Sequence, residues 1–169
     1  MPALLLPPDV TSVLKRFYTC EFTTVNSKQQ PLTWPTEPFY HEPEGEIIVT
    51  SSIAFPIKAY NARRNPHVAL LYSDSTGSGL EDPPAVLVQG TATSVEELTS
   101  DPDWSYEMFK ESMERQPAYR KFVANSFARS MFTFQFQRLA IFVHPQRILA
   151  WPHNDFTQAP VEIEVAYVE

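Results

Sequence analysis

Alternating and clustered hydrophobic residues predict a chain built mainly of short strands. Residues 46–52 show the pattern most clearly, because the β-branched Ile47, Ile48 and Val49 suit a buried strand and three hydroxyl residues follow at its end. Segments of similar character predict further strands at residues 17–25, 31–41, 67–72, 84–95, 139–143 and 147–151. Prolines make the segment 31–41 an edge or bulged strand, and Gly90 marks a bulge or a close backbone approach.

Three other segments have helical spacing. Val10, Val13, Leu14 and Phe17 predict an N-terminal helix capped by Asp9 or Thr11. A short helix is predicted after Pro56, and it ends at Asn65-Pro66 because a residue before proline avoids the α region. Residues 99–130 form the longest helical region, which is predicted as two helices, the second opened by Pro117.

The order of these elements defines the expected architecture. About six strands with helices inserted late, without βαβ alternation, predict a mainly β protein: an antiparallel barrel with helices after the fifth strand. At 169 residues the chain is most economically a single domain, residues 1–169.

Residues 46–66 also contain a candidate anion site. Thr50, Ser51 and Ser52 end a strand, and Lys58 falls near the first turn of the following helix. Hydroxyls, a lysine and a helix terminus together can hold an anion such as a phosphomonoester. The alternative interpretation is a solvated turn with a surface lysine.

Composition limits the partners and the compartment. A formal net charge of −7 and the lack of a basic run argue against nucleic acid or an anionic membrane as a partner. No apolar run reaches membrane-spanning length, the opening segment lacks a basic n-region, and the single Cys20 allows no internal disulfide. We therefore expect a cytoplasmic protein.

Several familiar chemistries find no support in the sequence. The four glycines form neither a dinucleotide fingerprint nor a P-loop. The four histidines lack metal-ligand spacing, Cys20 lies in mid-strand without a basic neighbour, and Ser51 is not part of a GxSxG elbow. We therefore predict no metal site and assign no catalytic side chain.

Five segments follow one another between about Phe17 and Trp151: TTVNSKQQP, the hydroxyl-bearing strand, KAYNARRNPHVALLY, VLVQGTATSV and RLAIFVHPQRILAW. The most specific motif is Lys58-x-x-Asn61 leading into Asn65-Pro66-His67-Val68-Ala69-Leu70. In the order of these segments the sequence resembles the pyridoxine-5′-phosphate oxidase-like flavin-binding split barrels. The resemblance implies a six-stranded antiparallel split β-barrel with Greek-key topology.

The resemblance also implies a set of cofactor-binding residues. The phosphate of FMN would be held by Ser51, Ser52 and Lys58, with Asn61 in the same motif. The second strand would bring Trp34, Pro35 and Thr36 along the isoalloxazine ring. Trp151, closing the last strand, would approach the flavin of a partner subunit, since the family is typically a homodimer with sites at the interface.

Departures from the family narrow the expected function to an FMN-dependent oxidoreductase that is not a vitamin B6 oxidase. Ile57 replaces one member of a basic pair, Trp34 stands where an arginine is expected, and no arginine follows Trp151. Two alternatives share the scaffold: an F420-dependent reductase and a non-catalytic flavin- or haem-binding protein. An F420 tail needs more basic residues than the nearby Lys58, Arg63 and Arg64. The sequence identifies neither the small-molecule substrate nor the electron donor.

Overall fold

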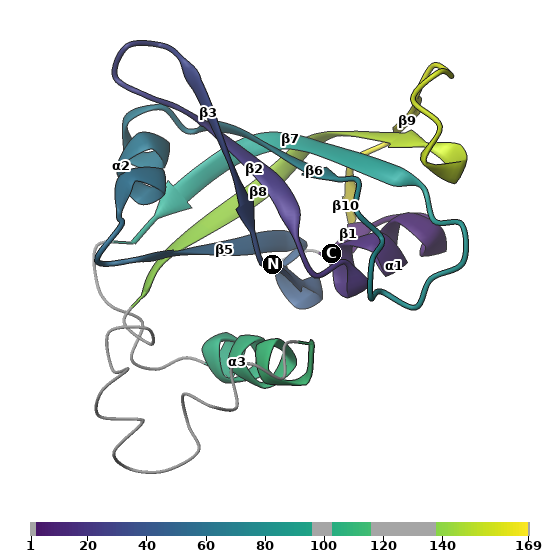
Figure 1. Cartoon of the computed structure of the whole chain (residues 1–169), viewed down its shortest axis with the longest axis horizontal. Coiled ribbons are helices and arrows are strands. Elements are labelled where there is room, and N and C mark those ends of the chain that lie inside the picture. Colours follow the sequence, from purple (N-terminus) through teal and green to yellow (C-terminus); the bar gives the residue numbers. More distant parts are fainter. Residues whose placement is uncertain (1–2, 96–102, 116–137, 169) are drawn as a thin grey trace.

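One curled antiparallel sheet dominates the described part of the chain (Figure 1). The computed structural model describes residues 3–95, 103–115 and 138–168. The strands of this sheet are β2 (Cys20–Val25), β3 (Pro31–Thr36), β4 (Pro38–His41), β5 (Glu46–Ser52), β6 (His67–Tyr72), β7 (Ala85–Ser94), β8 (Arg138–Trp151) and β9 (Val161–Ile163). Their spatial order is β3-β2-β6-β7-β8-β5-β4, and β9 pairs with β8.

The strand order explains how the sheet becomes a split barrel. β3 and β4 stand at the two ends of the order, yet only Glu37 separates them in the chain, so the sheet must curl back on itself. β6, β7 and β8 follow one another, and β5 pairs with β8, which is a Greek-key arrangement. Counting β3 and β4 as one interrupted strand and leaving out β9 gives the predicted six strands. The expectation of a mainly β split barrel with appended helices is therefore confirmed.

In the part of the chain that the structure describes, three α-helices accompany the sheet: α1 (Pro8–Arg16), α2 (Ile57–Arg64) and α3 (Asp103–Arg115). The predicted cap of α1 is wrong, because Pro7 occupies the N-cap and Asp9 already lies within the first turn. Pro8 suits the first helical position, because the backbone donors at a helix start have no partner within the helix. Of the helical region expected at 99–130, α3 is confirmed. The second helix, expected from Pro117, falls on residues that the structure does not describe.

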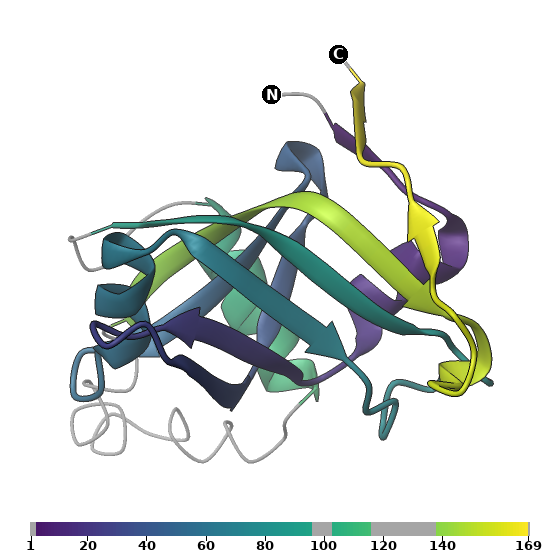
Figure 2. The ribbon, with the colours of Figure 1, turned by 90° about the horizontal axis from the view of Figure 1, so that it is seen from above.

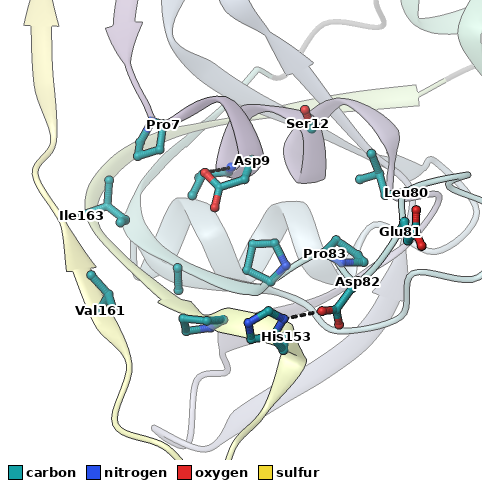
Figure 3. Close-up of a pocket in the computed structure, with 14 residues that line it drawn as sticks. Pro7, Asp9, Ser12, Leu80, Glu81, Asp82, Pro83, His153, Val161 and Ile163 are labelled. Carbon is teal, nitrogen blue, oxygen red and sulfur yellow. Dashed lines mark hydrogen bonds and ion pairs between the residues drawn. The ribbon is translucent and has the colours of Figure 1, made fainter.

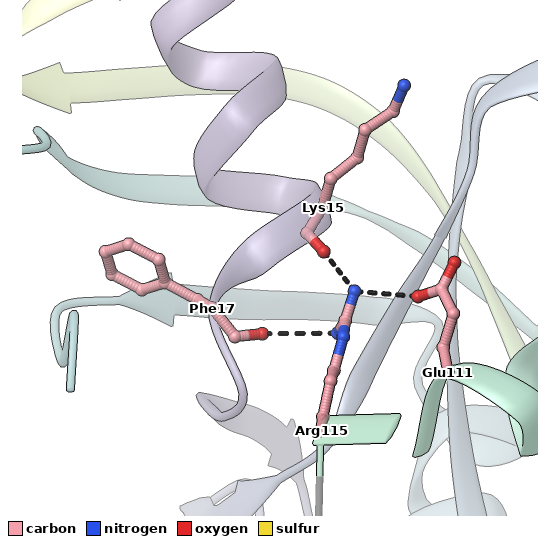
Figure 4. Close-up of polar contacts among 4 residues, drawn as sticks. All are labelled: Lys15, Phe17, Glu111 and Arg115. Carbon is pink, nitrogen blue, oxygen red and sulfur yellow. Dashed lines mark hydrogen bonds and ion pairs between the residues drawn. The ribbon is translucent and has the colours of Figure 1, made fainter. Parts of the chain in front are cut away.

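Two sets of contacts hold α3 against the rest of the fold. Met108 packs in a small apolar cluster with Phe39 of β4 and Ile48 of β5. Arg115 reaches the end of α1, donating to the carbonyl oxygens of Lys15 and Phe17, and it pairs with Glu111 at 2.7 Å (Figure 4). The carbonyls at a helix C-terminus lack intrahelical partners and attract a cation, so Arg115 connects α3 to α1.

The two ends of the chain form a separate ribbon. β1 (Ala3–Leu5) pairs antiparallel with β10 (Ala166–Val168), and Figure 2 shows the two termini side by side. Tyr167 Oη donates to the carbonyl oxygen of Pro145 at 3.0 Å, which attaches the ribbon to β8. Short 3-10 turns follow β4 at η1 (Glu42–Glu44) and β8 at η3 (Pro152–Asn154).

The core fills the inside of the curled sheet. Alternate residues of β2 point inward, and Cys20, Phe22 and Thr24 are buried while their neighbours are partly exposed. Leu14 of α1 and Ala59 of α2 close the core from the two ends of the barrel. Among the described residues, no helix is both long enough and apolar enough to span a membrane.

One strand replaces the two predicted at 139–143 and 147–151. β8 runs without a break through His144 and Pro145, because it carries one extra residue, Gln146, at a bulge, and Gly90 of β7 leaves room for the His144 backbone. The register shifts between Gln89 and Gly90, and a Cβ atom at Gly90 would lie 2.2 Å from the His144 carbonyl oxygen. The prediction that Gly90 marks a bulge with close backbone approach is confirmed.

Candidate functional site

A pair of basic side chains lies where β5 ends and α2 begins. Lys58, on the first turn of α2, donates a hydrogen bond of 3.3 Å to Thr36 Oγ1 of β3. Arg138, the first residue of β8, donates from Nε to Thr50 Oγ1 of β5 at 3.0 Å. The cross-strand register places Arg138 opposite Ser52. Two cations and three hydroxyl residues thus come together from four different elements.

The charge on Lys58 is disfavoured by its surroundings. Burial lowers the pKa of its ammonium group, and the positive charge of Arg138 lowers that pKa further. Two partly desolvated like charges repel each other, so a bound anion between them would stabilise both. The arrangement therefore suits a dianionic ligand such as a phosphomonoester.

Arg138 was not assigned as a site residue from the sequence, whereas Thr50 was one of the three hydroxyl residues of the candidate anion site. Arg138 stands at the start of a predicted strand, but nothing local indicates that this strand pairs with the hydroxyl-bearing one. Only the pairing of Ser52 with Arg138 brings the guanidinium group to Lys58. The one sequence feature that could have identified Arg138 as a site residue is its place at the start of a strand. That feature indicates a site residue only once the order of the strands in the sheet is known.

The two predicted serines support the turn that leads to Lys58. Ser51 is buried, and its hydroxyl donates to the Phe55 carbonyl oxygen at 2.8 Å. Ser52 Oγ accepts from the Ala54 amide at 3.2 Å, which leaves the hydroxyl hydrogen of Ser52 able to donate. In this structure Ser52 is better placed than Ser51 to face an anion beside Arg138. Cofactor binding by either serine stays a prediction.

Asn61 fixes the helix that carries Lys58. Its side chain is buried, and Nδ2 donates to Thr24 Oγ1 of β2 at 3.1 Å. Asn61 Oδ1 in turn accepts from Arg64 at 3.5 Å. A buried amide with both ends occupied holds α2 in one orientation on the sheet. The structure thus gives Asn61 a positioning role, while direct contact with a cofactor stays a prediction.

The predicted ring-binding strand adjoins the anion site. Thr36 Oγ1 accepts from Lys58 and donates to the Trp34 carbonyl oxygen at 3.3 Å. Trp34 is partly exposed opposite Phe22, whereas Pro35 is exposed opposite Glu21. Among the described strands β3 pairs with β2 alone, so its outer edge presents backbone groups to a ligand. A phosphate near Lys58 and a planar ring along β3 could therefore belong to one molecule.

Trp151 lies away from these residues within one chain. It ends β8 at the opposite terminus from Arg138 and pairs with Ala85. Its ring is 5.2 Å from the ring of Phe156, and it is partly exposed. One protomer does not bring Trp151 to Lys58, so any contact with the same cofactor requires a second copy of the chain. That contact stays a prediction.

Other reactive groups do not form a site. Within residues 3–95, 103–115 and 138–168 there is no group of three His, Cys, Asp or Glu side chains able to hold a metal ion. Burial raises the pKa of the Cys20 thiol well above its ordinary value, which keeps the sulfur protonated and unreactive. Neither finding supplies a nucleophile or a metal ligand near Lys58.

Comparison with solved structures identifies the fold. A conserved hypothetical protein, Rv2991 from Mycobacterium tuberculosis, is 21% identical with a TM-score of 0.60, and the match covers 93% of this chain and 91% of that one. A putative pyridoxamine 5′-phosphate oxidase from Listeria innocua is 17% identical with a TM-score of 0.54, covering 83% and 94%. An F420 reductase is 18% identical with a TM-score of 0.55, covering 85% and 98%. No protein-family model matches the sequence, and neither does any curated protein.

These likenesses define the class of protein by its fold. The chain is a split barrel of the architecture shared by pyridoxamine 5′-phosphate oxidase-like proteins and F420 reductases. The resemblance suggested by Lys58-x-x-Asn61 is confirmed at the level of the fold. Because all three identities are low, the function must be argued from the residues at the site.

Proposed function

We propose that this protein binds FMN at the Lys58–Arg138 site and acts as an FMN-dependent oxidoreductase. The observation that carries the proposal is the convergence of Lys58 and Arg138, both partly buried, on hydroxyl residues at the end of β5. A flavin bound there would supply the redox chemistry. The chain would bind its phosphate through the two cations and align its ring along β3.

The position of Thr36 supports a flavin rather than a free phosphate. Thr36 contacts both the ammonium group of Lys58 and the backbone of Trp34. A ligand that fills the site would therefore meet an exposed sheet edge directly beside its phosphate. A planar heterocycle with donors and acceptors on its rim can form hydrogen bonds with the exposed backbone of β3. Trp34 offers an aromatic face beside that backbone.

The proposal is tested by comparing FMN with riboflavin. Calorimetric titration of the purified protein is expected to show tighter binding of FMN, by about a hundredfold or more, because only FMN offers a phosphate to two cations. Anaerobic addition of NADH or NADPH should then bleach the bound flavin, and an added acceptor should restore its absorbance. Equal affinity for the two flavins would exclude this site, and a flavin that no donor reduces would favour a non-catalytic binding protein.

Binding of FMN should depend on pH through Lys58. Its pKa in the free protein is lowered by burial and by Arg138, so the lysine becomes neutral at a lower pH than an ordinary lysine. Bound phosphate favours the charged form and raises the pKa again. Affinity should hence be constant between the second pKa of the phosphate, about 6, and the lowered pKa of Lys58, and should fall as the pH rises through the lysine pKa. Lys58→Arg keeps its charge and should remove this decline, and an identical decline in both proteins would exclude Lys58 as its source.

Trp151 should report on the flavin of the partner subunit in a homodimer. Trp151→Phe preserves an aromatic ring against Phe156, so the fold and the dimer are expected to persist. Bound FMN should fluoresce several-fold more strongly, because contact with tryptophan quenches flavins, or should bind about tenfold more weakly. Sedimentation supplies the control, since a species of only 19.3 kDa at micromolar concentration would contradict the dimer. Unchanged emission and affinity would make Trp151 a structural residue.

An F420-dependent reductase is the second candidate, favoured by the match to an F420 reductase over 85% of this chain. Its longer anionic tail would need further cations beyond Lys58 and Arg138. Arg63 already donates to the Val95 carbonyl oxygen at 2.8 Å and stacks on Tyr60. Competition between FMN and F420 in one titration distinguishes the candidates, and mass spectrometry of a co-purified ligand gives an independent answer.

A further inference from the structure

Lys58 differs from Lys15 and Lys28 in its surroundings. Lys15 forms an ion pair with Glu42 at 2.6 Å, and Lys28 is exposed. Lys58 is partly buried, and the hydroxyl oxygen of Thr36 accepts its hydrogen bond at 3.3 Å. Among the residues that the structure describes, no carboxylate forms an ion pair with Lys58. Its ammonium group therefore lacks the counter-ion that usually accompanies a buried charge.

The groups that face Lys58 from the neighbouring strands are neutral or positively charged. Burial lowers the pKa of Lys58, and the charge of Arg138 on β8 lowers it further. Cys20 of β2 is also near, and burial raises the pKa of its thiol, so that group is uncharged at neutral pH. Thr36 of β3 contributes a neutral hydroxyl. A partly buried lysine beside another cation holds more of the neutral amine than an exposed lysine does, and the neutral amine is the nucleophile.

Groups that bind a phosphate lie beside this amine. Arg138 is charged at every physiological pH, and the cross-strand register places it opposite Ser52. The hydroxyl of Ser52 is able to donate while its oxygen accepts from the Ala54 amide. Guanidinium and hydroxyl groups are good donors to phosphate oxygens. A short ligand with its phosphate on Arg138 would therefore have its other end close to the amine of Lys58.

The opposite end of the barrel does not offer this combination. A pocket of about 440 Å³ lies there, between α1 and the chain that follows β8 (Figure 3). Among the described residues that line it there is no lysine or arginine, and the carboxylates of Asp9, Glu81 and Asp82 belong to its lining. A negatively charged ligand is thus repelled from that pocket and attracted to the Lys58 end.

We propose that, when no flavin occupies the site, Lys58 condenses with a small phosphorylated aldehyde and holds it as an imine. The amine nitrogen adds to the carbonyl carbon, and the carbonyl oxygen leaves as water with the two hydrogens of the amine. A C=N bond thereby replaces the C=O bond, and no oxidant or reductant is consumed. The inference does not rest on the proposed flavin function, because it needs only the amine and the groups that bind the phosphate.

Arg138 favours the condensation by holding the aldehyde in place. Its contact with the phosphate keeps the carbonyl carbon beside the amine, which converts a reaction between two molecules into one within a complex. A phosphate near Lys58 also favours the charged form of the lysine. Proximity nevertheless dominates, since effective concentrations in well-oriented complexes far exceed those of free aldehydes.

Reductive trapping on the full chain, freed of any bound flavin, tests the proposal. Glycolaldehyde phosphate is the probe, and glycolaldehyde is its uncharged counterpart. Sodium cyanoborohydride converts each imine to a stable secondary amine, and peptide mass spectrometry locates the label. Near neutral pH we expect glycolaldehyde phosphate to label Lys58 about tenfold faster than Lys28, and about tenfold faster than glycolaldehyde labels Lys58. Inorganic phosphate should slow the labelling of Lys58 several-fold and leave Lys28 unaffected.

Variants of Arg138 assign the phosphate preference to this residue. In Arg138→Gln the preference of Lys58 for glycolaldehyde phosphate over glycolaldehyde should fall to about twofold or less. Labelling by glycolaldehyde should also require a higher pH, because one cause of the lowered pKa of Lys58 is gone. Arg138→Lys keeps the cation and should retain much of the preference. Arg147→Gln is the matched control, since it makes the same substitution at an exposed position of β8 and should leave Lys58 labelling unaltered.

Each outcome of the trapping experiment has a definite meaning. Rapid labelling of Lys58 with a phosphate preference that Arg138→Gln removes, and that Arg147→Gln preserves, supports the proposal. Equal rates at Lys58 and Lys28 would overturn it, since Lys58 would then react as an ordinary surface lysine. Labelling of Lys58 without preference for the phosphorylated aldehyde would also overturn it. Both of these outcomes are measured on the parent protein and do not depend on the folding of a variant.

Discussion

Lys58→Ala is expected to weaken FMN binding by about tenfold to a hundredfold, the scale of one charge-assisted hydrogen bond of roughly 1.5 to 3 kcal/mol. Arg138→Gln should cost a similar factor, because it removes the second cation of the pair. In the double variant the two losses should combine to roughly a hundredfold to ten-thousandfold, with some departure from additivity because both groups share one ligand. Isothermal titration calorimetry measures all three.

Controls separate loss of charge from loss of structure. Lys28→Ala removes one positive charge from the exposed turn between β2 and β3 and should leave FMN affinity unaltered. Arg138→Lys should recover part of the affinity by restoring the cation. Riboflavin should bind every variant equally, since it lacks the phosphate. Equal loss of riboflavin and FMN affinity would instead indicate a distorted barrel.

Removing Lys58 should not destabilise the free protein. Folding lowers the pKa of this lysine, so its charged form is less favourable in the folded state than in the unfolded one. That cost is present at neutral pH and disappears as the pH rises above the ordinary lysine range. Thermal unfolding of the flavin-free protein is therefore expected to give Lys58→Ala a melting temperature no lower than that of the parent.

Of the two cations at the candidate anion site, the sequence indicated Lys58 and not Arg138, and the reason is physical. Ser51, Ser52 and Lys58 are neighbours in the chain, so a strand that runs into a helix brings them together by local geometry. Arg138 joins them only through the pairing of β5 with β8, across 86 residues from Ser52. Hydrophobic patterns show that strands exist and do not show which strands pair. The missing cation was therefore beyond local inference.

In the fold, too, features set by neighbouring residues were predicted, and features set by distant residues were not. Proline at residues 35 and 38 correctly indicated an interrupted edge, which became β3 and β4 on either side of Glu37. His144-Pro145 was interpreted as a break between two strands, since proline removes a ladder hydrogen bond. β8 continues because it takes up the irregularity as a bulge with one extra residue, Gln146, and because Gly90 of its partner leaves room for the backbone at His144. That glycine lies about fifty residues away in the sequence, so nothing beside Pro145 indicates it.

Gly90→Ala should destabilise the protein by about 2 to 4 kcal/mol, the upper range for overpacking against rigid atoms. The new Cβ would lie 2.2 Å from the His144 carbonyl oxygen and 3.2 Å from the Pro145 Cα, both in the backbone of β8. Strand propensity alone predicts the opposite sign, because alanine is favoured over glycine by roughly 0.5 to 1 kcal/mol. The sign of the change therefore distinguishes the close approach from an ordinary strand position.

Urea unfolding monitored by tryptophan fluorescence measures the effect, and Thr93→Ala on the exposed face of the same strand supplies the control. Thr93→Ala is expected to change the unfolding free energy by no more than about 0.5 kcal/mol. Gly90→Ala should also lower the melting temperature by roughly 5 to 15 °C. A more stable Gly90→Ala protein would mean that β7 and β8 separate at the bulge, and β8 would then be two strands, as its proline first suggested.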